Sequence, residues 1–293
     1  MSQPPDQNDE LEGAMRRMEG EFGPRRLSEG GRGDAPPPGP GPVYGEARPI
    51  PTPPAPTRGP RRSGARAVWA ILATIVVIYV LSSLLSGSLT QPRLGALILL
   101  GAKENRLIDA GQYWRLITAT FLHANLIHIF FNSYALFALG PESERIYGTG
   151  RFLALYFIAG LGGSVASYLF SPAPSVGASG AIFGLIGGLG VFFYLSRRAL
   201  GEFARAQVQS MAAIAMINLF IGFASPGVID NWGHMGGLVA GAAVGAALAP
   251  RLTLDPQLYP PTLVRRFPPW GWPAAAAVAL ALVAAAVLLP GAG

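Results

Sequence analysis

Five polar side chains in otherwise apolar stretches are the candidates for chemistry: Ser179, His234, His128, Asn132 and His123. A serine hydroxyl is a weak nucleophile that needs an adjacent base, and a neutral imidazole is the usual one. Ser179 stands where a helix is expected to begin, and helix N-termini offer backbone N–H groups to a developing oxyanion. His128 and Asn132 lie four residues apart, on one helix face, and offer side-chain donors. The set is typical of acyl transfer by a serine–histidine dyad.

Each of these residues also has a structural interpretation. Ser179 is small enough for a tight helix crossing, and Asn132 can hydrogen-bond between helices. His123 and His128 can be satisfied histidines at a membrane interface. A metal site from the three histidines is conceivable, but no His-Glu-x-x-His pattern occurs and no carboxylate lies beside them. We therefore expect neither a metal nor a cofactor.

The composition indicates what must position these side chains. The chain has 293 residues, of which 51% are hydrophobic and 13% charged, whereas soluble domains carry about 25% charged residues. Residues 1–66 hold 10 Arg and 9 acidic residues, and the rest of the chain holds only 12 basic and 7 acidic ones. We expect an all-α, polytopic membrane helical bundle with seven transmembrane helices, at residues 67–86, 117–139, 152–170, 178–195, 208–224, 233–249 and 271–289.

Charge and cysteine content exclude other classes. The net charge of +6 suits arginine in cytoplasmic loops, so nucleic-acid binding is not expected. The absence of cysteine excludes disulfides, thiol catalysis and cysteine-ligated metals. Charged residues in the middle of the membrane, which a transporter or channel would show, are absent from the third, fifth and seventh expected spans.

Three regions follow from these patterns. Residues 1–62, rich in Pro and Arg, are expected to be a disordered cytoplasmic tail. Residues 67–250 are expected to hold the first six spans, and residues 251–293 a linker with the seventh transmembrane helix. Basic residues in the short loops place the N-terminus in the cytoplasm and the starts of the second, fourth and sixth spans near the outer face. Segment 87–116 conflicts with this count, because it lies outside yet carries four basic residues.

Two glycine stripes predict how Ser179 and His234 meet. Glycine recurs every fourth residue in the fourth and sixth spans, which gives each helix a smooth face for close backbone approach. We expect the two stripes to pack against each other, with these residues: Gly180, Gly184, Gly188, Gly233, Gly237, Gly241 and Gly245.

The combined motifs resemble the rhomboid family of intramembrane serine proteases. They are His123-x4-His128-x3-Asn132, Gly177-Ala178-Ser179-Gly180, His234-x2-Gly237-x3-Gly241, Trp114-Arg115 and Glu144-Arg145. The resemblance covers about residues 67–250. It implies a serine endopeptidase that cleaves single-span or other transmembrane proteins in the lipid bilayer. The expected location is a bacterial inner membrane, with the active site toward the outer face.

The same resemblance assigns roles to residues. Ser179 is the nucleophile and His234 its base, without a third acid. His128 and Asn132 match oxyanion positions, and His123 a structural one. Segment 87–116 is similar to a membrane-embedded hairpin loop, and Glu144 to a buried acid that organises a loop.

Two positions and one rival function stay open at this stage. Phe183 stands where some bacterial members have Tyr, so it can stack on the imidazole without hydrogen-bonding to it. Asp230 can orient His234 or simply face water. The rival function is a non-catalytic rhomboid-like protein that binds or routes membrane clients; such proteins lack the serine or the histidine, and this chain has both.

Overall fold

The computed structural model describes residues 65–225, 227–255 and 262–292. The predicted tail at residues 1–62 lies outside the described residues. In chain order the helices are α2 (Arg66–Ser86), α3 (Leu94–Leu100), α4 (Asn105–Asp109), α5 (Arg115–Thr118), the 3₁₀ helix η1 (Ala119–Phe121), α6 (Leu126–Tyr147), α7 (Thr149–Phe170), α8 (Ser179–Ala224), α9 (Asn231–Leu248) and α10 (Gly271–Leu288).

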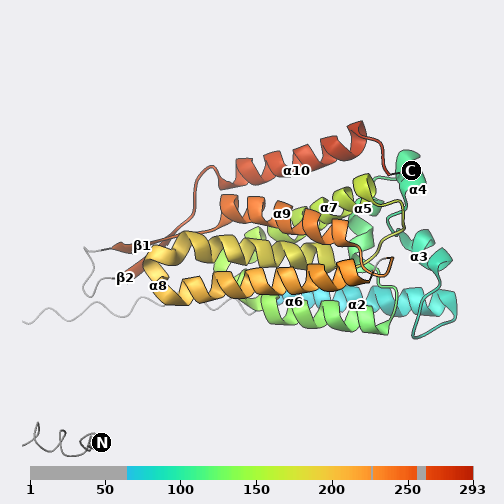
Figure 1. The fold of residues 1–293 in the computed structure, drawn as a ribbon, viewed down its shortest axis with the longest axis horizontal. Helices are drawn as coiled ribbons and strands as arrows, with labels where there is room; N and C mark the ends of the chain where they lie inside the picture. The colour runs from blue at the N-terminus through green and yellow to red at the C-terminus, as the bar shows by residue number, and fades with distance from the viewer. Residues whose placement is uncertain (1–64, 226, 256–261, 293) are drawn as a thin grey trace, which may run out of the picture. The chain divides into compact units, whose positions relative to one another are not determined.

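The all-α polytopic bundle is confirmed. Four of the described helices, α2, α7, α8 and α10, are long and apolar enough to cross a membrane. A fifth span results if α5–η1 and α6 are counted as one bent element. Helix α8 covers the fourth and the fifth expected spans. It consists of two helical segments that meet at Gly201, where the backbone angles are non-helical (φ 57°, ψ −134°) and the chain folds back (Figure 1). Helix α9 occupies the expected sixth span. It is not among the four apolar helices, because polar residues such as Asn231 and His234 in its first turns lower its mean hydropathy.

One sequence-based expectation is wrong in detail. The second span is not one helix over 117–139, because the chain bends by 92° between η1 and α6. Asn125 caps α6 there, accepting a hydrogen bond from the His128 N–H at 2.8 Å. The linker after the core has secondary structure of its own. It contains an antiparallel pair of strands, β1 (Arg251–Asp255) and β2 (Thr262–Arg266), with Arg251 opposite Arg266.

The ribbon shows which elements share an end of the bundle. Helices α6, α8 and α9 begin at the end that also carries α3 and α4, and the β1–β2 pair lies at the opposite end (Figure 1). Helices α7, α8 and α9 form the densest part of the core. The chain therefore brings the starts of three helices together, as the loop charges predict, and the candidate residues with them.

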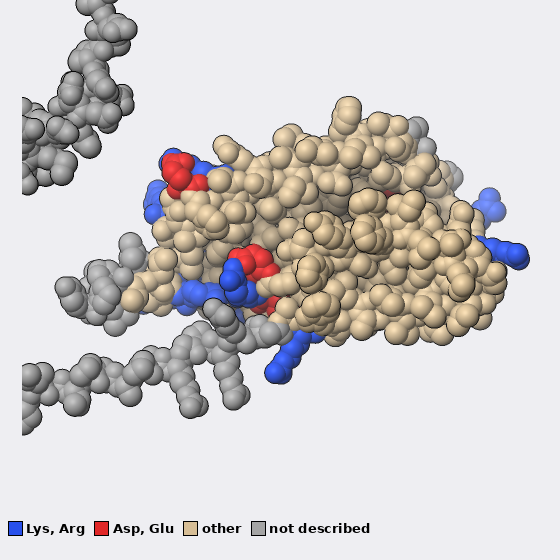
Figure 2. All heavy atoms as spheres, turned by 90° about the horizontal axis from the view of Figure 1, so that it is seen from below, with Lys and Arg blue, Asp and Glu red and all other residues tan. Residues whose placement is uncertain are grey.

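The surface is consistent with a lipid-facing belt. On the face drawn in Figure 2, Lys, Arg, Asp and Glu gather toward the two ends, and a broad band between them is largely free of charge. Large apolar side chains are exposed on α2, α6, the second half of α8 and α10. In water such a surface would be a liability, whereas in a bilayer it is the expected outer face.

Glu144 ties three elements together at the end opposite the candidate site. Its side chain is fully buried and accepts hydrogen bonds from the backbone N–H groups of Ala67 (3.3 Å) and Val68 (3.1 Å) at the start of α2. It also accepts from the Thr149 hydroxyl at 2.8 Å, at the turn into α7. A carboxylate that caps one helix and fixes the next turn is the loop-organising acid that the resemblance implies.

The segment after α10 contacts the end of α7 and the start of α4. The Ala292 N–H donates to the carbonyl of Tyr168 at 2.9 Å, near the end of α7. The Asn105 amide donates to the carbonyls of Ala292 (2.7 Å), Tyr168 (3.1 Å) and Ser171 (3.2 Å). Asn105 thus joins the start of α4, the end of α7 and the segment that follows α10.

Candidate active site

Ser179 is the first residue of α8, and the chain turns sharply just before it. Gly177 has φ +130°, which L side chains rarely adopt, and its N–H donates to the carbonyl of Ala119 at 2.9 Å. A Cβ at Gly177 would lie 2.6 Å from the His128 Nε2 and 3.8 Å from the Ser179 Oγ. Only glycine fits there, and the side chains of Ser179 and His128 both lie within 4 Å of the point that a Cβ would occupy.

His234 lies in the first turns of α9, with a helix cap and an aromatic ring beside it. The Asp230 carboxylate caps the helix by accepting from the Gly233 N–H at 2.9 Å. The imidazole is 8% exposed and stacks on Phe183, with ring centroids 4.2 Å apart and planes at 14°. Among the described residues the His234 Nδ1 has no hydrogen-bond partner. Stacking on Phe183 therefore restrains the plane of the ring.

The predicted glycine contact between α8 and α9 is present. A Cβ at Gly237 would overlap the backbone of Gly180, and one at Gly241 would overlap the backbone of Gly184. At Gly245 it would lie 2.6 Å from the Cα of Gly188. Both series ascend together, so the two helices run parallel with their backbones in contact. Backbones can approach this closely only where the residues in contact have no side chain, as is the case for glycine.

This contact places Ser179 near His234. Ser179 and Phe183 lie four residues apart on one face of α8, and the Phe183 ring touches the imidazole. Ser179 is therefore on the face that meets α9, one turn nearer the end of the bundle. Within the described chain, the two side chains are not joined by a hydrogen bond, and Ser179 is half-buried. The dyad assignment stays a prediction that rests on this proximity.

Of the two oxyanion candidates, His128 lies beside the turn before Ser179, whereas the side chain of Asn132 bonds within its own helix. His128 lies against Gly177 and its ring meets the His123 ring edge to face, with centroids 5.0 Å apart. The Asn132 amide donates to the His128 carbonyl at 2.9 Å, so its bond lies within α6. His123 is fully buried in the bend between η1 and α6, not on a helix, and no described residue hydrogen-bonds to its ring nitrogens. His128 is thus close to Ser179, and Asn132 positions the same turn of helix.

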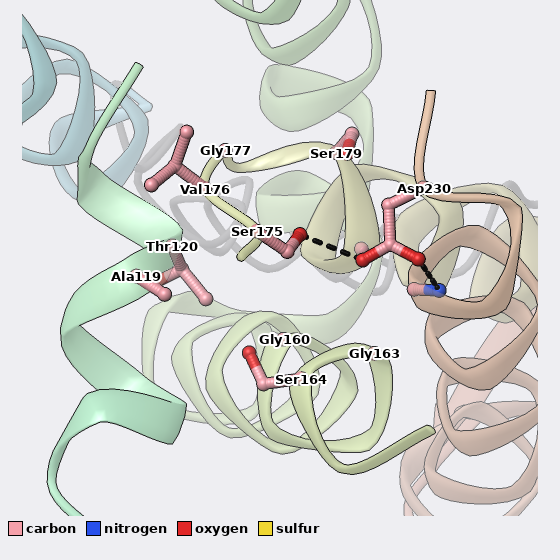
Figure 3. Close-up of a pocket in the computed structure, with 12 residues that line it drawn as sticks. Ala119, Thr120, Gly160, Gly163, Ser164, Ser175, Val176, Gly177, Ser179 and Asp230 are labelled. Atoms are coloured by element: carbon pink, nitrogen blue, oxygen red, sulfur yellow. Dashed lines mark hydrogen bonds between the residues drawn. The ribbon is translucent and has the colours of Figure 1, made fainter. Parts of the chain in front are cut away.

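A small cavity opens beside Ser179 (Figure 3). The space that water-sized molecules can reach inside it is about 20 Å³, enough for roughly one water molecule. Hydroxyl groups and the Asp230 carboxylate supply polar partners for such a water. The lining residues are Ala119, Thr120, Gly160, Gly163, Ser164, Ser175, Val176, Gly177, Ser179, Gly180, Asp230 and Gly233.

Asp230 has a role that was not considered from the sequence. Its half-buried carboxylate caps α9 and accepts a hydrogen bond from the Ser175 hydroxyl at 2.6 Å. The rule that a capping residue stands three positions before the N–H it accepts could have identified this role.

Lys103 is the contributor that sequence reasoning missed. It is 1% exposed, and its ammonium donates to the carbonyls of Ser171 (2.6 Å) and Ala173 (2.9 Å) in the loop before Ser179. One signal was available: it is the single lysine in a chain with 21 arginines. Arg115 is also buried, bonded to the carbonyls of Ile98 and Ala102. Two of the four basic residues in segment 87–116 are therefore internal, which removes much of their conflict with the loop charges.

Comparison with known proteins gives a consistent result. The chain matches the family model described as the Rhomboid domain over residues 110–251. It is 44% identical over 180 residues to rhomboid protease GluP of Bacillus subtilis, covering 61% of this chain and 34% of that protein. It is 36% identical over 179 residues to RHOMBOID-like protein 5 of Arabidopsis thaliana, covering 59% and 57%. It is 32% identical over 226 residues to Rhomboid-like protease 1 of Toxoplasma gondii, covering 76% and 73%. The chain thus spans about a third of the first of these relatives and just over half of the second.

Proposed function

The chain belongs to the rhomboid family, and on that premise we propose that it is an intramembrane serine protease that cleaves peptide bonds in or near transmembrane segments of other proteins. Its partners are single-span or other transmembrane substrates and the lipid bilayer that holds them. Segments of this kind reach the site from the membrane, since the candidate residues lie in a bundle whose helices α2, α7, α8 and α10 are long and apolar enough to cross it. The observation that carries the proposal is the stacking of His234 on Phe183, one turn after Ser179.

In the proposed mechanism the Ser179 Oγ attacks the scissile carbonyl carbon while the His234 imidazole accepts the hydroxyl proton. The carbonyl oxygen becomes an oxyanion next to backbone N–H groups at the start of α8 and the His128 ring. Collapse of this intermediate breaks the C–N bond, and the imidazolium gives its proton to the leaving amine. The products of this half-reaction are an acyl ester on Ser179 and a free amine.

Hydrolysis of the ester needs a water molecule in a site surrounded by apolar helices. The cavity beside Ser179 has room for about one water. In the proposed step a water that has moved from this cavity to the ester loses a proton to His234, its oxygen attacks the ester carbon, and the Ser179 oxygen leaves and regains the proton. The acid is released and both side chains return to their starting states.

No third acid takes part in this proposal. The nearby carboxylate, Asp230, is engaged by Ser175 and by the Gly233 N–H. Stacking on Phe183 fixes the plane of the imidazole instead, and burial limits its rotation. The loop charges further support an N-terminus in the cytoplasm and a site toward the outer face of a bacterial inner membrane.

Labelling with a fluorophosphonate, which reacts with activated serines, tests the proposal. We expect purified protein in detergent to be labelled and to cleave a single-span model substrate, and Ser179→Ala to lose both. Ser196→Ala is the matched control, because Ser196 is buried in the same helix with no described partner for its hydroxyl. Its labelling and cleavage should match those of the unmodified protein. A folded protein that neither labels nor cleaves would favour the non-catalytic, client-binding alternative.

A further inference from the structure

The loop between α7 and α8, residues 171–178, sets the position of Ser179, and it is held mainly from segment 101–105. Lys103 contributes four hydrogen bonds. Its ammonium donates to the carbonyls of Ser171 (2.6 Å) and Ala173 (2.9 Å). Its backbone pairs with Ser175 in both directions, each bond 3.0 Å long. One buried residue therefore fixes the loop at three points, the last of them four residues before the nucleophile.

The same loop is attached to the helix that carries the base. The Ser175 hydroxyl donates to the Asp230 Oδ2 at 2.6 Å, and the Asp230 Oδ1 accepts from the Gly233 N–H at 2.9 Å (Figure 3). Gly233 precedes His234 directly. A continuous series of hydrogen bonds thus runs from Lys103 through Ser175 and Asp230 to the first turn of α9. We call these three residues the Lys103–Asp230 network.

The network contains a charge of each sign in a poorly solvated place. Burial lowers the pKa of Lys103 to about 8, and the charges of Asp230 and then Glu104 oppose that shift. Those two carboxylates are the charged groups that face the lysine; Glu104 is occupied in capping α4 through the Leu107 N–H at 2.9 Å. A buried ion is costly unless it is paired and hydrogen-bonded, so stability alone gives little reason for a lysine here.

We propose that Lys103 and Asp230 are positioning residues of the active site, which hold the 171–178 loop between the α3–α4 segment and α9 and thereby fix Ser179 relative to His234. The effect on turnover rests on the proposed protease function, whereas the effect on the loop does not. Since a misplacement of about 1 Å lowers rates on the order of a hundredfold, releasing the loop should lower kcat far more than it changes KM.

The test uses the full-length protein with Lys103→Met, which keeps the length of the side chain and removes its charge and donors. Arg106→Met is the matched control, because it removes an exposed cation three residues away on the same segment. We expect Lys103→Met to lower kcat by about tenfold to a hundredfold, with KM within about twofold. Arg106→Met should change neither constant.

Hydrogen exchange of the amides in residues 171–178 gives a readout that needs no proteolysis. We expect exchange there to be at least about tenfold faster in Lys103→Met and unchanged in Arg106→Met. Ser175→Ala, which removes one hydroxyl and leaves the backbone pairing in place, should act in the same direction but more weakly. This milder variant keeps the test usable if Lys103→Met folds poorly.

A double-mutant cycle and a pH profile separate positioning from general destabilisation. If both residues act through the loop, Lys103→Met with Ser175→Ala should be little worse than Lys103→Met alone. The kcat of the unmodified protein should fall above about pH 8, as the ammonium loses a proton and its hydrogen bonds weaken, and this fall should be absent in Lys103→Met. Loop exchange and kcat that both stay within twofold in Lys103→Met would overturn the proposal, as would additive effects in the cycle. Faster loop exchange in a protein that never cleaves would retain the network and reject the protease.

Discussion

The backbone contact between α8 and α9 makes a quantitative prediction about Gly241, a residue with no chemistry of its own. A Cβ added there would lie 2.6 Å from the carbonyl carbon of Gly184, and nearer still to that residue's Cα and oxygen. Carbon atoms pack at about 3.5–4.0 Å, and the obstacle is backbone, which no rotamer change can move. Gly241→Ala therefore requires the two helices to separate by about 1 Å.

Two costs follow from this separation. Overpacking of a tight contact costs about 1–3 kcal/mol, so the thermal midpoint in detergent should fall, and further in Gly241→Val. A displacement of about 1 Å at the dyad lowers rates on the order of a hundredfold. We therefore expect cleavage of a single-span substrate to decrease more steeply than the fraction of folded protein.

Gly150→Ala is the matched control for this experiment. Gly150 lies in the first turn of α7, not in a loop as expected from the sequence, and a Cβ there would meet no atom within 4 Å. Its stability and cleavage should stay close to those of the unmodified protein. Wild-type melting and turnover in Gly241→Ala would refute the packing argument and leave the dyad without its geometric support.

Two further predictions concern Phe183 and Glu144. Phe183→Ala removes the ring stacked on His234, and since such pairs contribute about 0.5–1.5 kcal/mol, kcat should fall about twofold to tenfold. Phe183→Tyr keeps the ring and should keep the rate. An equal loss of kcat in both variants would contradict a stacking role. Glu144→Gln replaces one of the two acceptor oxygens at the start of α2 with an NH2 group, and should cost about 1–3 kcal/mol of unfolding free energy, measured by thermal unfolding in detergent. Cleavage by the folded protein should be unchanged. Loss of cleavage without loss of stability would show that Glu144 acts on the site.

The parts of the fold that sequence predicted well depend on periodic patterns. Apolar stretches of about 20 residues indicated the helices, and glycine at every fourth position in α8 and α9 indicated which faces meet. The proximity of His234 to the α8 face that carries Ser179 followed from these patterns and from the loop charges. Each of these signals is local and repeated, so a single chain is sufficient to detect it.

The parts that sequence missed depend on contacts between distant segments. The bend at Asn125 looked like continuous helix because the flanking residues are apolar, and one capping side chain starts a new helix there. Lys103 was treated as a loop charge, whereas its partners lie about 70 residues later, at Ser171 and Ala173. Such pairings have no sequence period, and only the folded chain identifies them.

The hydrogen bonds of Asn105 have a consequence for the order of events during biosynthesis. Its amide joins Ser171, in the loop before the nucleophile, to Ala292, which is made 187 residues after it. At about 5–20 residues per second, the ribosome needs roughly 10–40 s to add that stretch. Once residue 234 has been made, the chain contains every dyad and oxyanion candidate, but the Asn105 amide still lacks its partner at Ala292. The segment after α10 therefore completes the support of the 171–178 loop only after residue 292 has been made, well after the loop itself.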